Sequence, residues 1–207
     1  KIWNYMVTEL GLAFPFLRGA FFLLRPQLDF RVRDIGTDGS AVAYQSRYLM
    51  QCFVDNPRAL RRACFHLFLH CIFRHVYHVP IAERDRENWN IAADVAVEYL
   101  ADSIDEDLLR EVESETRAAW YARFLAESRI MTAERIYRSL QIMELAPAER
   151  EELCETFGRC DHSLWKRKES KPPKTEERSL PIEEQRWADA AERIEKQLIT
   201  IGKEAGK

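Results

Sequence analysis

The sequence predicts a mostly α-helical α+β fold with one small β-hairpin. Glycine and proline are scarce, with 7 and 8 among 207 residues, and a chain with few turn-forming residues favours helices over a many-stranded sandwich. Apolar residues make up 46% of the chain and charged residues 31%, a composition that argues against a disordered chain and supports a sizeable core. One stretch, between residues 30 and 44, has the alternation and the turn residues of paired strands.

The first part of the chain is expected to combine helices with this hairpin. Residues 2–25 are dense in large apolar side chains and predict one helix or two. Phe30–Arg33 and Ala41–Tyr44 predict the two strands, and Gly36–Gly39 predicts the turn between them.

Helices account for most of the remaining chain. Asn56 and Pro57 supply a cap and a first-turn proline for a helix over residues 57–78. The acidic residues 102–115 are expected to form a solvated helical segment. The apolar pattern predicts further helices at residues 88–101, from Thr132 to Ile142, at 147–157 and at 182–201.

The chain divides into three parts. Residues 1–165 are expected to form one domain, and residues 166–181, charged and nearly free of apolar side chains, predict a flexible linker. Residues 182–207 are expected to form an amphipathic helix that leads toward a further domain. Because the chain begins with Lys1 and stops after a helical run, we expect it to be a piece of a longer protein.

Charge and cysteine content argue against several classes of protein. A net charge of -3 gives no electrostatic reason for binding nucleic acid. The apolar residues 14–24 are interrupted by Arg18, are too short for a membrane span and lack a signal-peptide cleavage site. Five cysteines without a C-x-x-C pair indicate free thiols in a reducing compartment, the cytoplasm. The absence of a serine nucleophile motif and of a glycine-rich phosphate loop argues against serine hydrolases and nucleotide-binding proteins.

Two histidines on the predicted helix 57–78 have the spacing of a metal site. His66 and His70 are four residues apart, which places them about 40° apart on one helix face. Two imidazoles at this spacing can bind one ion, as in the H-E-x-x-H motif of zinc proteases. Because such a pair also arises often by chance, the spacing alone does not establish a site.

His75 and His78 fall on a different side of this helix, about 180° and about 120° from His66, so they share its ion only if the helix breaks. They face the sector that holds Cys64 and Cys71, where a second site for a soft metal is one interpretation. The other interpretation is a half-buried face whose histidines are satisfied by hydrogen bonds.

The next predicted helix supplies candidate carboxylates. Asp94 is a suitable third zinc ligand, and Ala92 and Ala93 beside it are small enough to let two helices approach closely. Glu98 lies four residues further on and faces the same way. The alternative for Asp94 is an exposed charge on the helix surface.

Five short motifs follow one another along the chain. They are Thr37–Gly39, His66–His70, Trp89–Asp94, Ala133–Tyr137 and Asp161–Trp165. This succession resembles the metallopeptidase-like domain that precedes a VWA-like domain in bacterial proteins. In that family a Thr-Asp-Gly turn is followed by an H-E-x-x-H helix, a Trp-Asn-x-Ala-x-Asp helix, an Ala-Glu-x-x-Tyr segment and an Asp-x-His-x-x-Trp element.

The resemblance implies a zincin-like helical core with the hairpin beside the metal helix. It implies a zinc ion held by His66, His70 and Asp94, with His162 as a fourth ligand or a catalytic helper. It also implies a hydrolase that acts on a peptide or protein substrate, with a VWA-like domain in the same longer chain and a MoxR-type ATPase as partners.

The chain departs from this family at one position that matters for catalysis. Leu67 stands where the motif has Glu, the general base that deprotonates zinc-bound water. Because leucine cannot accept a proton, and general-base catalysis contributes about 10²–10⁴-fold in rate, loss of peptidase activity is the simplest expectation. Glu98 occurs where the family tends to carry Asn, so one hypothesis is that Glu98 replaces the lost base or adds a ligand. The other is independent drift in a pseudoenzyme.

Two functions are therefore expected from the sequence. The first is a metallopeptidase-like domain with impaired catalysis, which acts as a metal-binding or partner-binding module. The second is a metal-free structural domain for protein interaction, in which His66 and His70 form hydrogen bonds inside a polar pocket.

Overall fold

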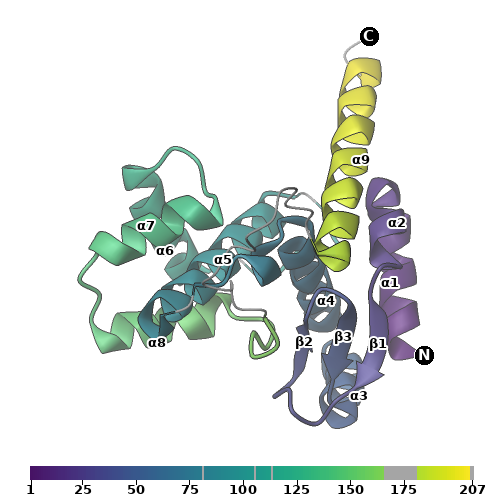
Figure 1. Cartoon of the computed structure of the whole chain (residues 1–207), viewed down its shortest axis with the longest axis horizontal. Helices are drawn as coiled ribbons and strands as arrows, with labels where there is room; N and C mark the ends of the chain where they lie inside the picture. The colour runs from purple at the N-terminus through teal and green to yellow at the C-terminus, as the bar shows by residue number, and fades with distance from the viewer. Residues whose placement is uncertain (81, 105, 113, 166–180, 206–207) are drawn as a thin grey trace, which may run out of the picture.

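The computed structural model describes residues 1–80, 82–104, 106–112, 114–165 and 181–205, and it confirms the mostly helical α+β fold (Figure 1). The α-helices are α1 (Ile2–Ala13), α2 (Arg18–Phe21), α3 (Ser46–Asp55), α4 (Pro57–Ile72), α5 (Glu83–Ser103), α6 (Glu115–Glu127), α7 (Ala133–Ile142), α8 (Pro147–Phe157) and α9 (Ile182–Ala205). The short 3₁₀ helices are η1 (Pro15–Leu17) and η2 (His75–Tyr77), and the strands are β1 (Arg25–Leu28), β2 (Ile35–Thr37) and β3 (Ala41–Tyr44).

The three strands form one small sheet in the order β1–β3–β2. β2 pairs with β3 in antiparallel fashion and forms the predicted hairpin, but its first strand lies at residues 35–37 and not at the predicted 30–33. All three residues of β2 are buried, so the strand lacks the alternation by which a half-buried strand is recognised. β1 pairs parallel to β3 and is exposed along its whole length, and the sequence pattern therefore does not reveal it.

The turn of the hairpin is held by its own residues. The Asp38 carboxylate accepts hydrogen bonds from the backbone N–H groups of Ser40 at 2.8 Å and Ala41 at 2.9 Å. Gly39 has a φ of 86°, a left-handed conformation that glycine adopts readily. The Gly39 carbonyl accepts a hydrogen bond from Trp187 Nε1 at 2.7 Å, so the turn also anchors α9.

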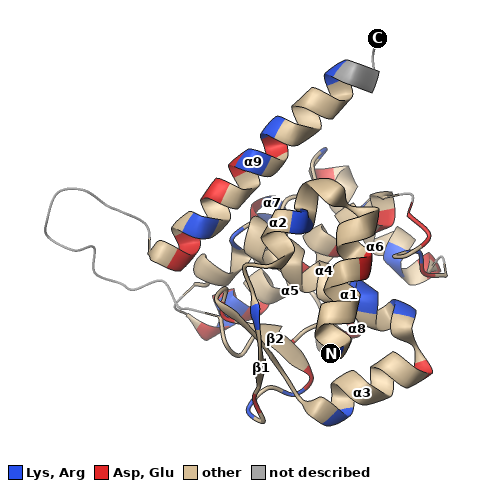
Figure 2. Ribbon diagram, turned by 90° about the vertical axis from the view of Figure 1, so that its right-hand side faces the viewer, with Lys and Arg blue, Asp and Glu red and all other residues tan. Residues whose placement is uncertain are grey.

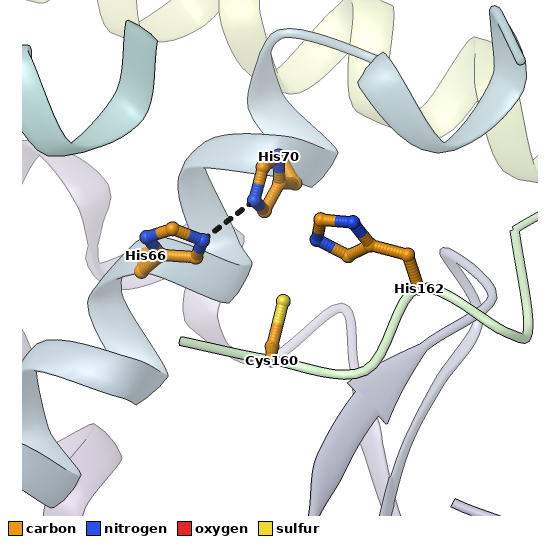
Figure 3. A group of neighbouring side chains, drawn as sticks. All are labelled: His66, His70, Cys160 and His162. Carbon is orange, nitrogen blue, oxygen red and sulfur yellow. Dashed lines mark hydrogen bonds between the residues drawn. The ribbon is translucent and has the colours of Figure 1, made fainter. Parts of the chain in front are cut away.

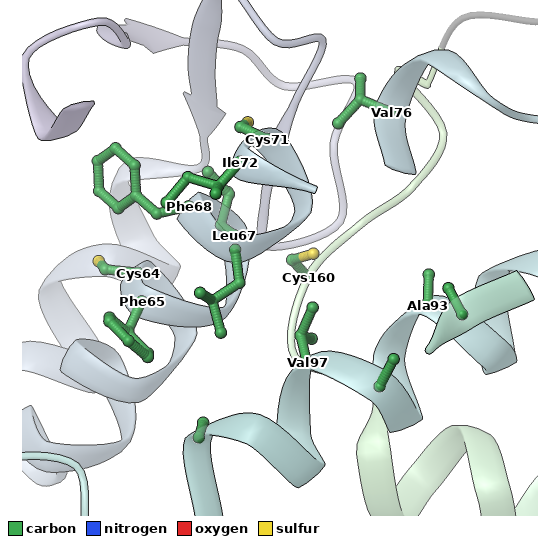
Figure 4. Packing of buried hydrophobic residues seen from close by; sticks show 14 of the residues in the cluster. Cys64, Phe65, Leu67, Phe68, Cys71, Ile72, Val76, Ala93, Val97 and Cys160 are labelled. Atoms are coloured by element: carbon green, nitrogen blue, oxygen red, sulfur yellow. The ribbon is translucent and has the colours of Figure 1, made fainter. Parts of the chain in front are cut away.

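Helix α4 forms the centre of the hydrophobic core. Apart from Arg61, every residue from Leu60 to Ile72 is buried. Figure 4 shows Leu67 of this helix among the buried side chains that surround it, with Val97 of α5 close by. Ala92 and Ala93 of α5 are fully buried, as expected for small residues that let two helices approach closely.

Helix α4 ends at Ile72, before the predicted end at residue 78. Arg74 has a φ of 59°, a left-handed conformation that interrupts the helix. The chain then turns back through η2, which brings His75 next to His70. His75 can approach His66 and His70 only if the helix breaks before it, and the structure contains this break.

The other helices agree with the predictions in type, although not everywhere in extent. α5 and α9 contain the predicted ranges, α7 begins directly after Thr132, and α8 spans the predicted residues 147–157. The acidic stretch differs, because the described residues from Ile104 to Ser114 lie outside helices and include the fully buried Leu109. The predicted linker lies outside the described residues except for Pro181.

The first turns of α9 pack on the rest of the chain, and its far end extends away from it (Figures 1 and 2). Trp187 is 1% exposed, whereas Leu198 is 47% exposed, so the apolar stripe of this helix is covered at its beginning. Figure 2 shows basic and acidic residues interspersed along α9. No helix in the described ranges combines the length and hydrophobicity that crossing a bilayer requires.

Candidate metal centre

Helix α4 places two imidazoles side by side in the core. The helix starts at Pro57, and the Asn56 side chain accepts a hydrogen bond from the backbone N–H of Ala59 at 3.0 Å. His66 and His70 are both 0% exposed, and their Nε2 atoms lie 2.8 Å apart. The two side chains face one point, as their spacing predicts.

Asp94 of α5 faces the same point. Its Oδ1 atom lies 3.0 Å from His66 Nε2 and 3.2 Å from His70 Nε2. Asp94 is 7% exposed, so the alternative interpretation, an exposed charge on the helix surface, is wrong.

Strand β2 holds the segment that follows α8. The backbone N–H of Asp161 donates to the carbonyl of Ile35 at 2.7 Å, and the Asp161 carboxylate accepts from the backbone N–H of Arg33 at 2.7 Å. The backbones of Asp161 and Gly36 form a bridge at this point. A Cβ atom added to Gly36 would lie 2.5 Å from the Asp161 carbonyl oxygen, so this approach requires glycine.

The bridge carries Cys160 and His162 to the imidazole pair, and Figure 3 shows the four side chains gathered around one point. The ligand atoms of four side chains lie within 4.8 Å of one another: His66, His70, Cys160 and His162. His162 Nε2 also lies 3.1 Å from Asp94 Oδ1. The His162 ring stacks on the indole of Trp165, with ring centroids 3.7 Å apart.

The side chains that the sequence named as metal ligands lie together in the structure: His66, His70, Asp94 and His162. Cys160 is the member of the group that sequence reasoning missed. The sequence does contain a signal for Cys160, because cysteine and histidine both bind zinc and Cys160 and His162 are separated by a single residue.

The arrangement suits a tetrahedral ion. The distances between the imidazole Nε2 atoms and Asp94 Oδ1, and between the Nε2 atoms of His66 and His70, range from 2.8 to 3.2 Å. Ligand atoms bound to tetrahedral zinc lie about 3.3 Å apart. His162 Nε2 is buried and lies 3.1 Å from Asp94 Oδ1, an oxygen that it shares with the other two imidazoles, without forming a well-aligned hydrogen bond, which is uncommon for a buried nitrogen. An ion at this point would give that nitrogen a better partner.

The outer ring nitrogens of the two α4 histidines are also engaged. His66 Nδ1 lies 2.8 Å from Glu98 Oε1, and His70 Nδ1 lies 3.1 Å from His75 Nδ1. His75 is itself held by Trp89, whose Nε1 donates to the His75 carbonyl at 3.2 Å. Histidines that bind metals typically use their second ring nitrogen in this way, and the contact fixes the orientation of the ring.

Burial and neighbouring charges set the protonation of the cluster. Burial raises the pKa of Asp94, but His162 and the hydrogen bonds from the other imidazoles lower it well below its usual value. Burial and the nearby charge of His66 lower the pKa of His70 well below its usual value. Burial also lowers the pKa of His66, but hydrogen bonds with Asp94 and Glu98 outweigh it and leave that pKa raised. Asp94 is therefore ionised and His70 neutral, the states in which these groups bind metals.

The position of Glu98 corrects the hypothesis that it replaces the missing base or adds a ligand. Its carboxylate is fully buried and contacts Nδ1 of His66, the ring nitrogen that faces away from the cluster. The same carboxylate pairs with three arginines: Arg62, Arg117 and Arg159. Burial raises the pKa of Glu98, but the hydrogen bond with His66 and the arginine charges lower it far below its usual value, which makes Glu98 a weak base.

Leu67, which stands where the H-E-x-x-H motif has Glu, belongs to the hydrophobic core. Leu67 is 0% exposed and is part of the large hydrophobic cluster (Figure 4). The cluster of ligands borders a cavity of about 650 Å³, to which Asp94, Cys160 and His162 all contribute. Three of the candidate ligands therefore line the cavity, whereas the Leu67 side chain is covered by its neighbours in the core.

The interpretation of a second soft-metal site is not supported. His78 Nδ1 lies 2.8 Å from the Arg74 carbonyl, and the Cys71 thiol lies 4.0 Å from Thr37 Oγ1. Within the described residues, the group that contains His66 is the one set of side chains close enough to hold an ion. All five cysteines are free thiols.

Comparison with protein-family models, with curated proteins and with solved structures found no match for this chain. The resemblance to the metallopeptidase-like family therefore rests on the order of its motifs. The candidate metal centre rests on the geometry of its side chains.

Proposed function

We propose that this chain is a zinc-binding domain of the metallopeptidase-like kind, in which His66, His70, His162 and Asp94 hold the ion. The observation that carries the proposal is that three imidazoles, two of them on fully buried residues, surround one carboxylate oxygen at 3.0, 3.2 and 3.1 Å. Imidazole nitrogen and carboxylate oxygen are both zinc ligands in proteins. Cys160, whose thiol belongs to the same group, is the alternative fourth ligand.

A polar core without an ion accounts less well for this arrangement. Buried ring nitrogens normally have separate hydrogen-bond partners, but the Nε2 atoms of His66 and His70 face each other at 2.8 Å, and those two and His162 Nε2 all lie against the same oxygen, Asp94 Oδ1. Because one carboxylate oxygen offers about two lone pairs, it cannot bond all three nitrogens well, and a buried nitrogen without a good partner costs about 1–3 kcal/mol. A shared ion would remove that cost.

Neither of the two positions considered for a general base, 67 and 98, supplies one. A bound zinc ion supplies Lewis acidity, and a general base must then accept the proton of the attacking water. Leu67 cannot accept a proton, and Glu98 is held by three arginines on the far side of His66. A set of four protein ligands also leaves no open position, as in structural zinc sites. We therefore assign the ion a structural role and expect no peptidase activity.

Metal analysis of protein purified without chelator tests this proposal. Wild type should carry about one zinc per chain, and His66→Ala and Asp94→Ala should lose it. His78→Ala is the matched control, because this imidazole bonds the Arg74 carbonyl outside the group and should leave the zinc content unchanged. Zinc at about 100 times its dissociation constant should stabilise wild type by about 2.7 kcal/mol. Metal-free wild type whose melting temperature does not respond to zinc would refute the proposal.

A second candidate is a metal-free interaction domain. The observation in its favour is that Asp94 lies within hydrogen-bond distance of His66 and His70, so that much of the pocket is satisfied by the protein itself. The partners would then be the VWA-like domain of the longer chain and a MoxR-type ATPase. Unchanged binding of this chain to the VWA-like domain after His66→Ala and Asp94→Ala, measured by calorimetry with metal-free protein, would favour this function.

A further inference from the structure

We propose that Glu98 is a positioning residue of the metal centre, which holds the His66 ring so that Nε2 faces Asp94. This role rests on the proposed zinc site and concerns a residue that does not touch the ion. Glu98 is 0% exposed, and its Oε1 atom lies 2.8 Å from His66 Nδ1. Because an ionised carboxylate only accepts hydrogen bonds, Nδ1 carries the proton of this bond, and Nε2 is the nitrogen left for an ion.

The same carboxylate reaches the other half of the centre. Glu98 Oε2 pairs with Arg159 Nε at 3.4 Å, and Arg159 directly precedes Cys160 in the chain. One buried side chain therefore connects His66 on α4 with the segment that carries Cys160 and His162. The two groups of ligands come from distant parts of the sequence, and Glu98 lies between them.

The surrounding charges explain how a carboxylate can be held here. The ion-pair network around Glu98 contains three buried side chains, Arg62, Glu98 and Arg117, and three that reach the surface, Asp102, Glu111 and Arg159. Its three positive and three negative charges balance, which limits the cost of burial. Asp102 pairs with Arg62 at 2.6 Å and with Arg117 at 3.3 Å, two of the arginines that Glu98 contacts. Among these six described side chains, Glu98 is the one that bonds His66.

Asp102 is therefore a matched control for Glu98. Asp102→Asn removes one charge from the network and leaves the bond to His66 in place. Glu98→Gln keeps the shape of the side chain and removes its charge. Glu98→Asp keeps the charge that the arginines need but shortens the side chain, so it cannot reach both the arginines and His66 at their present distances.

Competition titration of the full chain with a chromophoric zinc chelator distinguishes the bond from Glu98 to His66 from the general contribution of the network charges. We expect both Glu98 variants to bind zinc about 10–100-fold more weakly than wild type, the usual effect of losing a residue that orients a metal-bound histidine. Asp102→Asn should stay within about twofold, because it leaves the orienting bond intact. Circular dichroism checks that each variant folds, and Glu98→Asp decides the matter if Glu98→Gln does not fold.

A spectroscopic measurement reports on the hydrogen bond between Glu98 and His66 itself, and Asp102→Asn controls for a general loss of stability in the network. In ¹⁵N-edited spectra of the zinc-loaded chain, the His66 Nδ1 proton should exchange slowly with solvent in wild type and in Asp102→Asn, and faster in Glu98→Gln. Equal zinc affinity in wild type and both Glu98 variants, or an equal loss in Asp102→Asn, overturns the positioning role alone. Wild type that binds no zinc overturns the proposed function, and the positioning role with it.

Discussion

Replacing Gly36 by alanine should weaken zinc binding although Gly36 touches no ligand. The added Cβ would lie 2.5 Å from the Asp161 carbonyl oxygen, and ordinary contact begins at 3.4 Å, so the two backbones must separate by about 0.9 Å. That movement stretches the hydrogen bond from Asp161 to Ile35 and the one from Arg33 to Asp161, both 2.7 Å long. Each is worth about 0.5–1.5 kcal/mol, so we expect a loss of about 1–3 kcal/mol in unfolding free energy.

The same displacement moves Cys160 and His162, which flank Asp161. Metal sites tolerate deviations of about 0.2 Å in ligand distance, so we expect zinc affinity to fall about tenfold or more. Denaturant unfolding and competition titration measure the two effects. Gly19→Ala is the control, because a Cβ at this helical position meets no atom within 4 Å and should leave zinc affinity unchanged. Wild-type zinc affinity in Gly36→Ala would refute the idea that the bridge positions this segment.

Three further predictions concern the centre itself. Asp94→Asn should lower zinc affinity at least about tenfold while the fold is kept, and an unchanged affinity in the same titration would exclude Asp94 as a ligand. Leu67→Glu should not create peptidase activity, and it should lower the unfolding free energy by about 2–5 kcal/mol because position 67 is fully buried. A Leu67→Glu variant that is as stable as wild type and hydrolyses peptides would contradict this prediction. Zinc affinity should rise from pH 6 to pH 8, because zinc competes with the proton of His66, whose pKa is raised above 6.5, and equal affinities at the two pH values would contradict that competition.

Helical spacing made part of the centre predictable. His66 and His70 lie on a regular helix, on which residues four apart lie on nearly the same face. The small residues beside Asp94 predicted a close contact between two helices. These features are local, so the sequence contains them. The prediction extended to His162 through the resemblance in motif order, and in the structure His162 Nε2 lies 3.1 Å from Asp94 Oδ1.

The remaining features depend on contacts between distant segments. Cys160 reaches the group because Asp161 is bonded to β2, far away in the sequence, and no local pattern encodes that bond. Glu98 was a candidate for a substitute base because it stands where the family tends to carry Asn, in a chain that has lost the carboxylate at position 67. Its actual surroundings come from arginines on α4, on α6 and after α8, which only the folded chain brings together.

Two boundaries of secondary structure were missed for similar reasons. The end of α4 depends on the left-handed conformation of Arg74, and arginine carries no signal of a helix break. Arg74 Nη1 lies 3.6 Å from Glu184 Oε1 of α9, so the end of α4 is also in contact with a helix from the other end of the chain. The first strand of the hairpin is short and buried on both faces, which removes the alternation that predicts a strand.

X-ray absorption at the zinc edge of the zinc-loaded chain tests most directly whether His66, His70 and His162 hold one ion. We expect a first shell at about 2.0–2.1 Å with the scattering of several imidazoles, and a sulfur at about 2.3 Å if Cys160 takes the place of Asp94. The imidazole signal should weaken in His70→Ala and persist in His78→Ala. A first shell of oxygen atoms without imidazole scattering would show that these histidines do not bind the ion.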